Sequence, residues 1–249
     1  MEEKIAIVTG GSRGIGKEAA LLLARNGYKV CINYNNNAKA ADEVVENIKN
    51  GGGAAIAIKA NVANEHEVID LFAQVDQKLG KVTALVNSAG ILSAKTSIEG
   101  LDAARIEKVL TTNVIGTMLC CREAVKRMAY KYGGCGGSIV NLSSMAALKG
   151  SPNDFIDYAV SKGAIDTLTI GLAQEVAKEG IRVNAVRPGI IKTEMHNDSG
   201  DMNRVKNIEA SIPLGRAGEA FEVAEAIYWL ISEKVSYTTG AFINVSGGR

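Results

Sequence analysis

The fold follows from one segment near the start of the chain, Ile5-Ala6-Ile7-Val8-Thr9-Gly10-Gly11-Ser12-Arg13-Gly14-Ile15-Gly16. Its first four residues form an apolar run that predicts a buried strand, and helical spacing of apolar residues follows over 15–26. The glycines between them permit a tight turn and let the backbone approach a pyrophosphate at the positive end of the helix. Because this turn lies between the first strand and the first helix, it predicts a dinucleotide site rather than a glycine-rich turn without a ligand.

Beyond this segment, short apolar runs alternate with longer runs of helical spacing. Strands are expected at 5–8, 30–34, 54–60, 83–87, 138–142, 181–186 and 241–245, and helices at 15–26, 38–49, 103–131, 157–178 and 219–232. A further helix is expected to start at a capping pair, Asn64 and Glu67, and to end at Lys78. The repetition predicts parallel strands joined by right-handed crossovers. The expected fold is α/β: a Rossmann-type doubly wound parallel sheet of about seven strands, with helices on both faces, as a single domain over 1–249.

Charge and composition narrow the possible partners. Twenty-eight basic residues face twenty-seven acidic ones, so no charge excess points to nucleic acid or to an anionic membrane. No signal peptide is visible, and no apolar run approaches the roughly 20 residues that a membrane helix needs. The four cysteines are Cys31, Cys120, Cys121 and Cys135, and they show no metal-ligand spacing. We therefore expect reduced thiols, no metal and a cytoplasmic protein.

The end of the second expected strand indicates which dinucleotide binds. A site for NAD would place an acidic residue there to accept from the ribose 2′-hydroxyl, whereas the sequence reads Asn33-Tyr34-Asn35-Asn36-Asn37. Cations and amides suit a 2′-phosphate, and Arg13 in the glycine turn, or Lys39, supplies a cation. NADP(H) is therefore favoured over NAD(H), which stays possible. The alternative for Arg13 is a solvated loop arginine.

A tyrosine and a lysine supply acid–base chemistry. Tyr158 and Lys162 are four residues apart on an expected helix, so they share a face. A nearby ammonium favours the phenolate, and lowering the pKa of a tyrosine from about 10 to about 7 needs roughly 4 kcal/mol of preferential stabilisation. Tyr158 would then donate a proton to a carbonyl oxygen as hydride arrives, or remove it in the reverse direction. Any helix can carry such a pair, so the spacing alone does not establish this role.

Two serines follow the fifth expected strand. Ser143 and Ser144 lie at the carboxyl edge of the sheet, where open α/β sheets bind ligands. A serine hydroxyl there would hold the substrate oxygen beside Tyr158. The alternative is that both serines only cap or turn the chain.

The substrate region is expected where the regular pattern breaks. Gly, Asn, Asp and Ser are frequent over 188–218, and a break of this length in a compact domain is usually a functional loop. We assign 190–212 as a substrate loop or lid, and 91–97 with 145–155 as the rest of the pocket lining. The loop holds Met195, His196 and Met202.

Three polar side chains near the expected pocket bear on the substrate. His196 is either a substrate contact or an exposed loop residue. Asp154 and Asp157 lie close to Tyr158 in the sequence and hint at a polar portion of the substrate.

Taken together, the motifs resemble those of the short-chain dehydrogenase/reductase family over essentially the whole chain. The family's Thr-Gly-x-x-x-Gly-x-Gly turn is matched at Thr9–Gly16. The other matches, in order, are Asn87-Ser88-Ala89-Gly90, Thr112-Asn113-Val114, a serine after the fifth strand, Tyr158-Ala159-Val160-Ser161-Lys162, and Pro188-Gly189 leading to Thr193. Each motif is modest, but six in the correct order are specific. Residues 163–169 and 187–191 resemble bacterial 3-oxoacyl-carrier-protein-reductase-like and glucose-dehydrogenase-like oxidoreductases.

The resemblance implies an NADP-dependent oxidoreductase that interconverts a carbonyl and a secondary alcohol, with a small-molecule substrate. It makes Tyr158 the general acid/base and assigns Ser144 to the substrate oxygen, with Ser143 as the alternative. Lys162 would hold the nicotinamide ribose and tune the tyrosine. Asn113 would hold a water that links the lysine to solvent, or bond the backbone in a helix bend, or do both.

The same resemblance implies a set of coenzyme-binding residues and a homotetramer. The set is Gly10, Ser12, Arg13, Gly14, Ile15, Gly16, Tyr34, Asn35, Asn36, Asn61, Val62, Asn87, Ala89, Gly90, Tyr158, Lys162, Pro188, Gly189, Ile191 and Thr193. Two positions depart from the family pattern. Asn61 stands where many members have an Asp facing the adenine amine, and Ser88 replaces the second Asn after the fourth strand. An amide can still accept a hydrogen bond, so coenzyme binding should survive.

Two other functions are compatible with parts of the pattern. One is a catalytically silent dinucleotide-binding regulator on the same fold, because fold alone does not give function. The presence of Ser144, Tyr158, Lys162 and Asn113 argues against it. The other is a nucleotide-sugar epimerase, which also uses Tyr-x-x-x-Lys. Those chains are usually longer, and their glycine turn is spaced differently.

Overall fold

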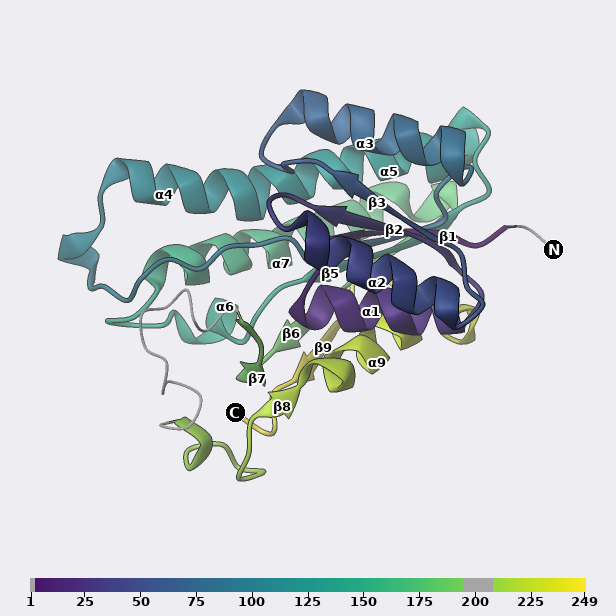
Figure 1. The fold of residues 1–249 in the computed structure, drawn as a ribbon. Coiled ribbons are helices and arrows are strands. Elements are labelled where there is room, and N and C mark those ends of the chain that lie inside the picture. Colours follow the sequence, from purple (N-terminus) through teal and green to yellow (C-terminus); the bar gives the residue numbers. More distant parts are fainter. Residues whose placement is uncertain (1–2, 195–207) are drawn as a thin grey trace.

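The computed structural model describes residues 3–194 and 208–249. Its main sheet is parallel and has the strand order β3-β2-β1-β4-β5-β6-β9 (Figure 1). The strands are β1 (Ile5–Thr9), β2 (Lys29–Tyr34), β3 (Ala55–Lys59), β4 (Ala84–Asn87), β5 (Gly137–Leu142), β6 (Ile181–Pro188) and β9 (Phe242–Val245). The order reverses between β1 and β4, so the predicted doubly wound sheet of seven strands is confirmed.

Helices cover both faces of this sheet (Figure 1). On one face lie α1 (Gly14–Arg25), α2 (Ala38–Asn50) and α9 (Ala220–Ile231), and on the other α3 (Glu65–Lys78), α5 (Gly116–Met128) and α7 (Ile156–Val176). Because side chains alternate along a strand, β1 feeds both cores. Ala6 and Val8 pack toward α1, whereas Ile5 and Ile7 pack toward α3 and α5.

The helix predicted over 103–131 is present over 103–128, but one wide turn interrupts its α-helical hydrogen bonding. It consists of α4 (Ala103–Leu110), a π-helical turn over Thr111–Ile115, and α5, which ends at Met128. In the turn the Gly116 N–H bonds the Thr111 carbonyl, five residues back. Such π-turns often occur at functional sites. Apolar periodicity does not resolve a single wide turn inside a helix.

Of the capping pair predicted at the start of α3, only Asn64 acts as a cap. Asn64 accepts hydrogen bonds from the backbone N–H groups of His66 and Glu67, as an N-cap does. The Glu67 carboxylate does not return to Asn64, because it accepts from the Asn61 N–H at 2.8 Å instead. It therefore stabilises the turn that follows β3.

A short two-stranded ladder lies within the irregular segment 188–218. β7 (Ile191–Lys192) pairs in parallel with β8 (Gly218–Glu219) and holds the two ends of the segment together. Two residues per strand give no periodicity, so the sequence did not predict it. Met195, His196 and Met202 lie outside the described residues.

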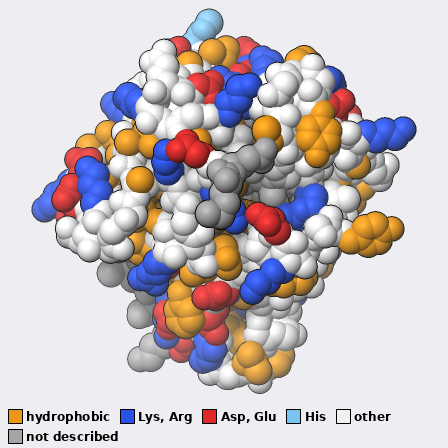
Figure 2. Space-filling model, turned by 90° about the vertical axis from the view of Figure 1, so that its right-hand side faces the viewer, with side chains coloured by type: hydrophobic (Ala, Val, Ile, Leu, Met, Phe, Trp, Pro, Cys, Tyr) orange, Lys and Arg blue, Asp and Glu red, His pale blue; other side chains and the backbone are white. Residues whose placement is uncertain are grey.

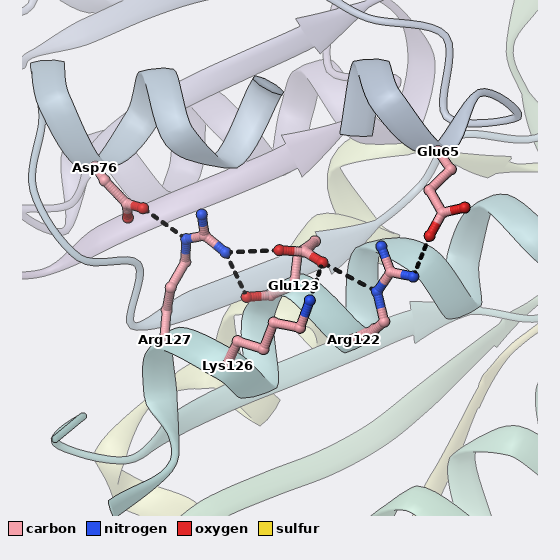
Figure 3. Close-up of polar contacts among 6 residues, drawn as sticks. All are labelled: Glu65, Asp76, Arg122, Glu123, Lys126 and Arg127. Atoms are coloured by element: carbon pink, nitrogen blue, oxygen red, sulfur yellow. Dashed lines mark hydrogen bonds and ion pairs between the residues drawn. The ribbon is translucent and has the colours of Figure 1, made fainter. Parts of the chain in front are cut away.

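An ionic cluster joins α3 to α5 (Figure 3). The buried Glu123 carboxylate is its centre, and it accepts from Arg122 at 3.0 Å, Lys126 at 2.8 Å and Arg127 at 2.9 Å. Arg127 also bonds Asp76 at 2.7 Å, and Arg122 pairs with Glu65. Two helices that cover the same face of the sheet are thereby fixed relative to each other.

Basic and acidic residues nearly balance, and the net charge is +1. Figure 2 shows basic and acidic side chains intermixed on one face of the molecule. Within residues 3–194 and 208–249, no helix is long and apolar enough to span a bilayer. The same ranges contain no cluster of three or more His, Cys, Asp or Glu side chains suited to a metal ion.

Candidate active site

The glycine-rich turn forms a backbone cradle at the carboxyl edge of the sheet. Gly10 and Gly14 have φ angles of +62° and +52°, a region that favours glycine. A Cβ on Gly10 would come within 2.9 Å of the Ala89 Cα, and one on Gly16 would collide with the Gly10 carbonyl. The turn thus needs glycine at these positions. It leaves the N-terminus of α1 open to an anionic group.

Thr9 connects this cradle to the turn after β4. Its hydroxyl accepts from the backbone N–H groups of Ser88 and Ala89, each at 3.1 Å, and donates to the Val86 carbonyl. The turns after β1 and β4 are therefore held side by side. Strand order reverses at this point, where doubly wound sheets bind their ligands.

One cavity of about 740 Å³ runs along this edge, a size typical of ligand sites. Most of the predicted coenzyme residues line it: Gly10, Ser12, Arg13, Gly14, Ile15, Tyr34, Asn35, Asn36, Asn61, Val62, Ala89, Gly90, Pro188, Gly189, Ile191 and Thr193. Ser143, Ser144, Tyr158 and Lys162 line the same cavity. The two sets of residues predicted from separate motifs are thus brought together.

Three predicted site residues lie behind the cavity wall. Gly16 packs against Gly10, as described above. The Asn87 amide donates to the Asn141 side-chain oxygen at 2.9 Å and fixes β4 against β5. Asn113 is buried as well. These residues support the cavity from outside its lining.

At one end of the cavity, polar side chains follow β2 and β3. The buried Asn33 amide donates to the Ala60 carbonyl at 2.9 Å and ties the ends of the two strands together. Tyr34, Asn35 and Asn36 follow Asn33 into the cavity lining. The Asn61 side-chain oxygen accepts from the Ala63 N–H at 3.1 Å, so it stabilises its own turn. Over 33–37 the chain carries amides and a phenol where a carboxylate would favour NAD.

Tyr158 and Lys162 share a face of α7, as their spacing predicts. The Lys162 Nζ lies 5.5 Å from the centroid of the Tyr158 ring and donates to the Leu142 carbonyl at 2.6 Å. Lys162 is buried and Tyr158 half-buried. Burial lowers the pKa of Lys162 to about 8, although the Asp166 carboxylate opposes the shift. Its positive charge is therefore poorly solvated and acts strongly on neighbouring groups.

Asn113 lies in the π-helical turn and clamps the loop that follows β4. Its Oδ1 accepts from the Ile91 N–H at 2.8 Å, and its Nδ2 donates to the Ile91 carbonyl and to the Ser161 hydroxyl, each at 3.1 Å. The backbone-bonding role is thus observed. A Cβ on Gly90 would lie 3.4 Å from Asn113 Oδ1 and 3.8 Å from Lys162 Nζ. Asn113 and Lys162 therefore flank the same glycine.

The two serines after β5 have different environments. Ser143 is buried and its hydroxyl donates to the Lys162 carbonyl at 3.2 Å. Ser144 is half-buried, and its hydroxyl oxygen accepts from the Ala146 N–H at 3.1 Å, at the start of α6 (Ala146–Lys149). Ser144 therefore stabilises the local turn before α6, as the sequence allowed, and it is not the helix cap. Because its hydroxyl proton is not used in that bond, Ser144 is better suited than Ser143 to a ligand oxygen.

The chain after β6 closes the cavity from the opposite side. A Cβ on Gly189 would come within 2.8 Å of the Ser246 Cα, so the turn after β6 lies tightly against the chain after β9. The Thr193 side chain is 3.3 Å from the position that a Cβ on Gly14 would take. The glycine cradle and the Pro188–Gly189 turn thus face a common space.

Some residues around the cavity have positions that the sequence did not reveal. Asp157 does not face a substrate as the hint suggested, because it is buried and accepts from Arg105 Nε at 2.8 Å. Arg105 also donates to the Ala94 carbonyl, so it ties the 91–97 loop to α7. Asp154 lines the cavity and pairs with Lys95 at 2.7 Å. These pairs are distant in sequence, and no motif marks them.

Two cations were also missed. Lys149, the last residue of α6, and Arg249, after β9, both line the cavity. Neither belongs to an apolar period or to a recognised motif.

Comparison with known proteins gives a consistent family. The family model described as "Enoyl-(Acyl carrier protein) reductase" matches residues 10–249. The chain is 56% identical over 245 residues to the uncharacterized oxidoreductase YgfF of Escherichia coli (strain K12), covering 98% of this chain and 99% of that protein. It is 39% identical to a 3-oxoacyl-[acyl-carrier-protein] reductase of Homo sapiens, covering 99% and 98%.

Solved structures agree with these relatives. A dehydrogenase/reductase from Sinorhizobium meliloti 1021 superposes with a TM-score of 0.92 at 32% sequence identity, covering 100% of this chain and 95% of that one. Family membership implies a nicotinamide dinucleotide as coenzyme and accounts for the glycine cradle and the Tyr158–Lys162 pair in one cavity. The chain is an oxidoreductase that belongs to the short-chain dehydrogenase/reductase family.

Proposed function

We propose that the protein is an NADP(H)-dependent oxidoreductase that interconverts a carbonyl and a secondary alcohol, with Tyr158 as the general acid/base. One observation carries the proposal: a buried amine, Lys162 Nζ, lies 5.5 Å from the Tyr158 ring in the cavity that the glycine turn also lines. A proton donor and a site for a hydride carrier thereby share one enclosed space.

The cavity suits a dinucleotide along its length. Gly10 and Gly14 let the backbone approach a pyrophosphate at the N-terminus of α1. Pro188, Gly189 and Thr193 would bound the nicotinamide, because they line the same cavity as that turn. The bound coenzyme would supply or accept the hydride.

Side chains of the protein would transfer the proton and orient the substrate. Tyr158 donates a proton to the carbonyl oxygen in reduction and removes it in oxidation. The Lys162 cation favours the phenolate, toward the roughly 4 kcal/mol that a tyrosine active near pH 7 requires. Ser144 donates to the same substrate oxygen, while Asn113 holds a water that connects the amine to solvent.

NADP(H) is preferred over NAD(H) in this proposal. Arg13 lines the cavity together with Tyr34, Asn35 and Asn36. A guanidinium and amides suit a 2′-phosphate, whereas the carboxylate that would select a free 2′-hydroxyl does not occur over 33–37.

The proposal is tested with Tyr158→Phe. This variant should lose at least a thousandfold in kcat while it binds NADPH within about threefold of the wild type, because only the proton donor is removed. NADPH oxidation with a panel of ketones measures turnover, and quenching of protein fluorescence measures binding. Tyr237→Phe, at a fully exposed tyrosine, is the matched control and should behave as wild type.

Two outcomes would count against the proposal. Turnover by Tyr158→Phe within tenfold of wild type would exclude this phenol as the acid. NADPH binding by the wild type without oxidation on any ketone, thioester, sugar, diketone or quinone would instead favour a silent dinucleotide-binding regulator.

We also propose a homotetramer in a reducing cytoplasm. Large apolar side chains are exposed on α5 and α7, among them Met118, Val160 and Ile170, and Phe221 and Trp229 are exposed on α9. Such surfaces favour self-association. Three of the four thiols are buried and all are free, as in a reducing compartment. Light scattering of the purified protein gives the oligomer mass, and a monomer would contradict the assembly.

A further inference from the structure

The charged side chains along the cavity do not all have a role in the proposed reaction. Those in the described lining are Arg13, Lys149, Asp154, Lys162, Glu194 and Arg249. Arg13 and Lys162 have roles above, and Asp154 pairs with Lys95. Glu194 lies beside Gly14, at the pyrophosphate end. Lys149 and Arg249 remain, and both are cations.

Arg249 is held in place by the turn that follows β9. Its backbone N–H donates to the Ser246 carbonyl, and Gly248, with φ of +88°, packs against the Pro213 ring. The guanidinium Nη1 is buried and has no hydrogen-bond partner among the residues that the structure describes. An unpaired buried donor costs about 1–3 kcal/mol. An oxyanion that accepts from it would recover that cost.

Lys149 comes from a different part of the chain. It ends α6, the short helix that begins directly after Ser144, so it belongs to the segment between the proposed substrate serine and Tyr158. Burial lowers the pKa of Lys149, and the positive charge of Arg249 lowers it further. Both cations therefore border the same cavity. Within the described ranges, neither forms an ion pair.

We propose that Arg249 and Lys149 bind an oxyanion of the substrate, so that the enzyme acts on carbonyl compounds that carry a carboxylate or a phosphate. This inference rests on the proposed function. The anion is bound at the Ser144 end of the cavity and is unchanged by the reaction. The carbonyl carbon gains hydride from NADPH and its oxygen gains the proton of Tyr158, which solvent then replaces. NADP⁺ and an alcohol that still carries the carboxylate or phosphate are released.

The first test compares charged and neutral forms of one ketone. The pairs are 3-oxobutanoate, 4-oxopentanoate and 5-oxohexanoate with their methyl esters, and dihydroxyacetone phosphate with dihydroxyacetone. In the wild type kcat/KM should favour the charged member of at least one pair. Arg249→Gln should reduce that charged-to-neutral ratio at least tenfold, and the more exposed Lys149→Gln about threefold. The carboxylate and phosphate pairs show which oxyanion fits.

Matched controls remove a cation of the same type far from the cavity. Arg25→Gln, at the last turn of α1, and Lys178→Gln, after α7, should leave the ratio unchanged, because both side chains are exposed. An unchanged ratio in Arg249→Gln, or a wild type that prefers the neutral ketones throughout, would overturn the proposal.

A second test does not depend on turnover. Calorimetric titration of 4-oxopentanoate and of inorganic phosphate into the NADP⁺-saturated protein should show binding that weakens at least tenfold in Arg249→Gln. Equal affinity in both proteins, or no binding to the wild type, would contradict the anion site.

The two tests separate the inference from the proposed function. Equal turnover of charged and neutral ketones would leave the oxidoreductase activity standing and remove the anion site. Arg249-dependent binding without any turnover would support the anion site and count against the proposed function.

Discussion

The buried Lys162 ammonium lowers the stability of the folded protein but favours the proposed reaction. Its ammonium is removed from water, and burial lowers its pKa to about 8. The same cation lies near the Tyr158 ring, where it would lower the energy of a phenolate. Groups with perturbed pKa values cluster at functional sites, where the rest of the fold offsets the free energy lost by removing their charge from water.

The free-energy cost of burying the Lys162 ammonium depends on pH. The unfolded chain binds the lysine proton near pH 10.5 and the folded chain near pH 8, so wild-type stability rises as the pH increases from about 8 to about 10.5. A shift of this size corresponds to a cost on the order of 3 kcal/mol at pH 7. Lys162→Met should therefore be more stable than wild type at pH 7, and its advantage should shrink toward pH 10.5.

Urea denaturation of both proteins at pH 7.5 and at pH 10 measures the effect. Lys178→Met, at an exposed lysine, is the control and should show no pH-dependent difference from wild type. Parallel stability curves for wild type and Lys162→Met would contradict a destabilising buried ammonium.

A second prediction at the residue scale concerns Arg13 and the proposed preference for NADP(H). Arg13→Ala should raise the dissociation constant of NADPH about 10- to 100-fold and that of NADH less than threefold, because only the former has a 2′-phosphate. Fluorescence titration with each coenzyme gives both constants. Arg25→Ala, at the other end of α1, should change neither. Equal weakening of the two coenzymes would remove the argument for NADP(H).

At the scale of elements, the π-helical turn between α4 and α5 shows what periodicity leaves out. The sequence predicted a long helix and, from a family resemblance, a functional Asn113 within it. The wide turn and the clamp on Ile91 depend on contacts with a loop 22 residues earlier. Local spacing contains no information about such a contact. The Arg105–Asp157 pair, 52 residues apart, was missed for the same reason.

The α3–α5 cluster gives a prediction about stability. Burial raises the pKa of Glu123, but hydrogen bonds from Lys126 and Arg127 outweigh it and hold the pKa below its ordinary value. Glu123→Gln leaves three neighbouring cations without their common anion (Figure 3). The free energy of unfolding at pH 7 should fall by about 1–3 kcal/mol, less than for a fully buried pair because Arg122 and Lys126 are partly exposed.

Acid titration gives the sign of this effect. The stabilisation is present above the unfolded pKa of about 4.3 and is lost as the pH falls through the lower folded pKa, so the gap between wild type and Glu123→Gln should close on acidification. Glu46→Gln, in an exposed pair with Lys49, should cost less than about 0.5 kcal/mol at any pH. A Glu123→Gln protein as stable as this control would show that the cluster contributes nothing net.

For the whole molecule, the sequence was sufficient for the sheet and for most of the cavity. Strands buried on both faces read as apolar runs, and glycines with positive φ mark the tight turn that lines the cavity. The sequence did not reveal that two further cations line the cavity. Arg249 and Lys149 are a hundred residues apart in the sequence, and Arg249 lines the cavity because β9 ends beside the turn after β6. Tertiary placement, rather than local pattern, decides such a site.

The pairing of β7 with β8 has a consequence for how this scaffold can change. It fixes Ile191 opposite Gly218 and Lys192 opposite Glu219, so the entry and exit of the intervening chain are set independently of what lies between them. Closing a longer loop costs only about 0.6 kcal/mol per doubling of its length. The stretch between the two strands can therefore be exchanged or lengthened while the glycine turn and Tyr158 keep their positions.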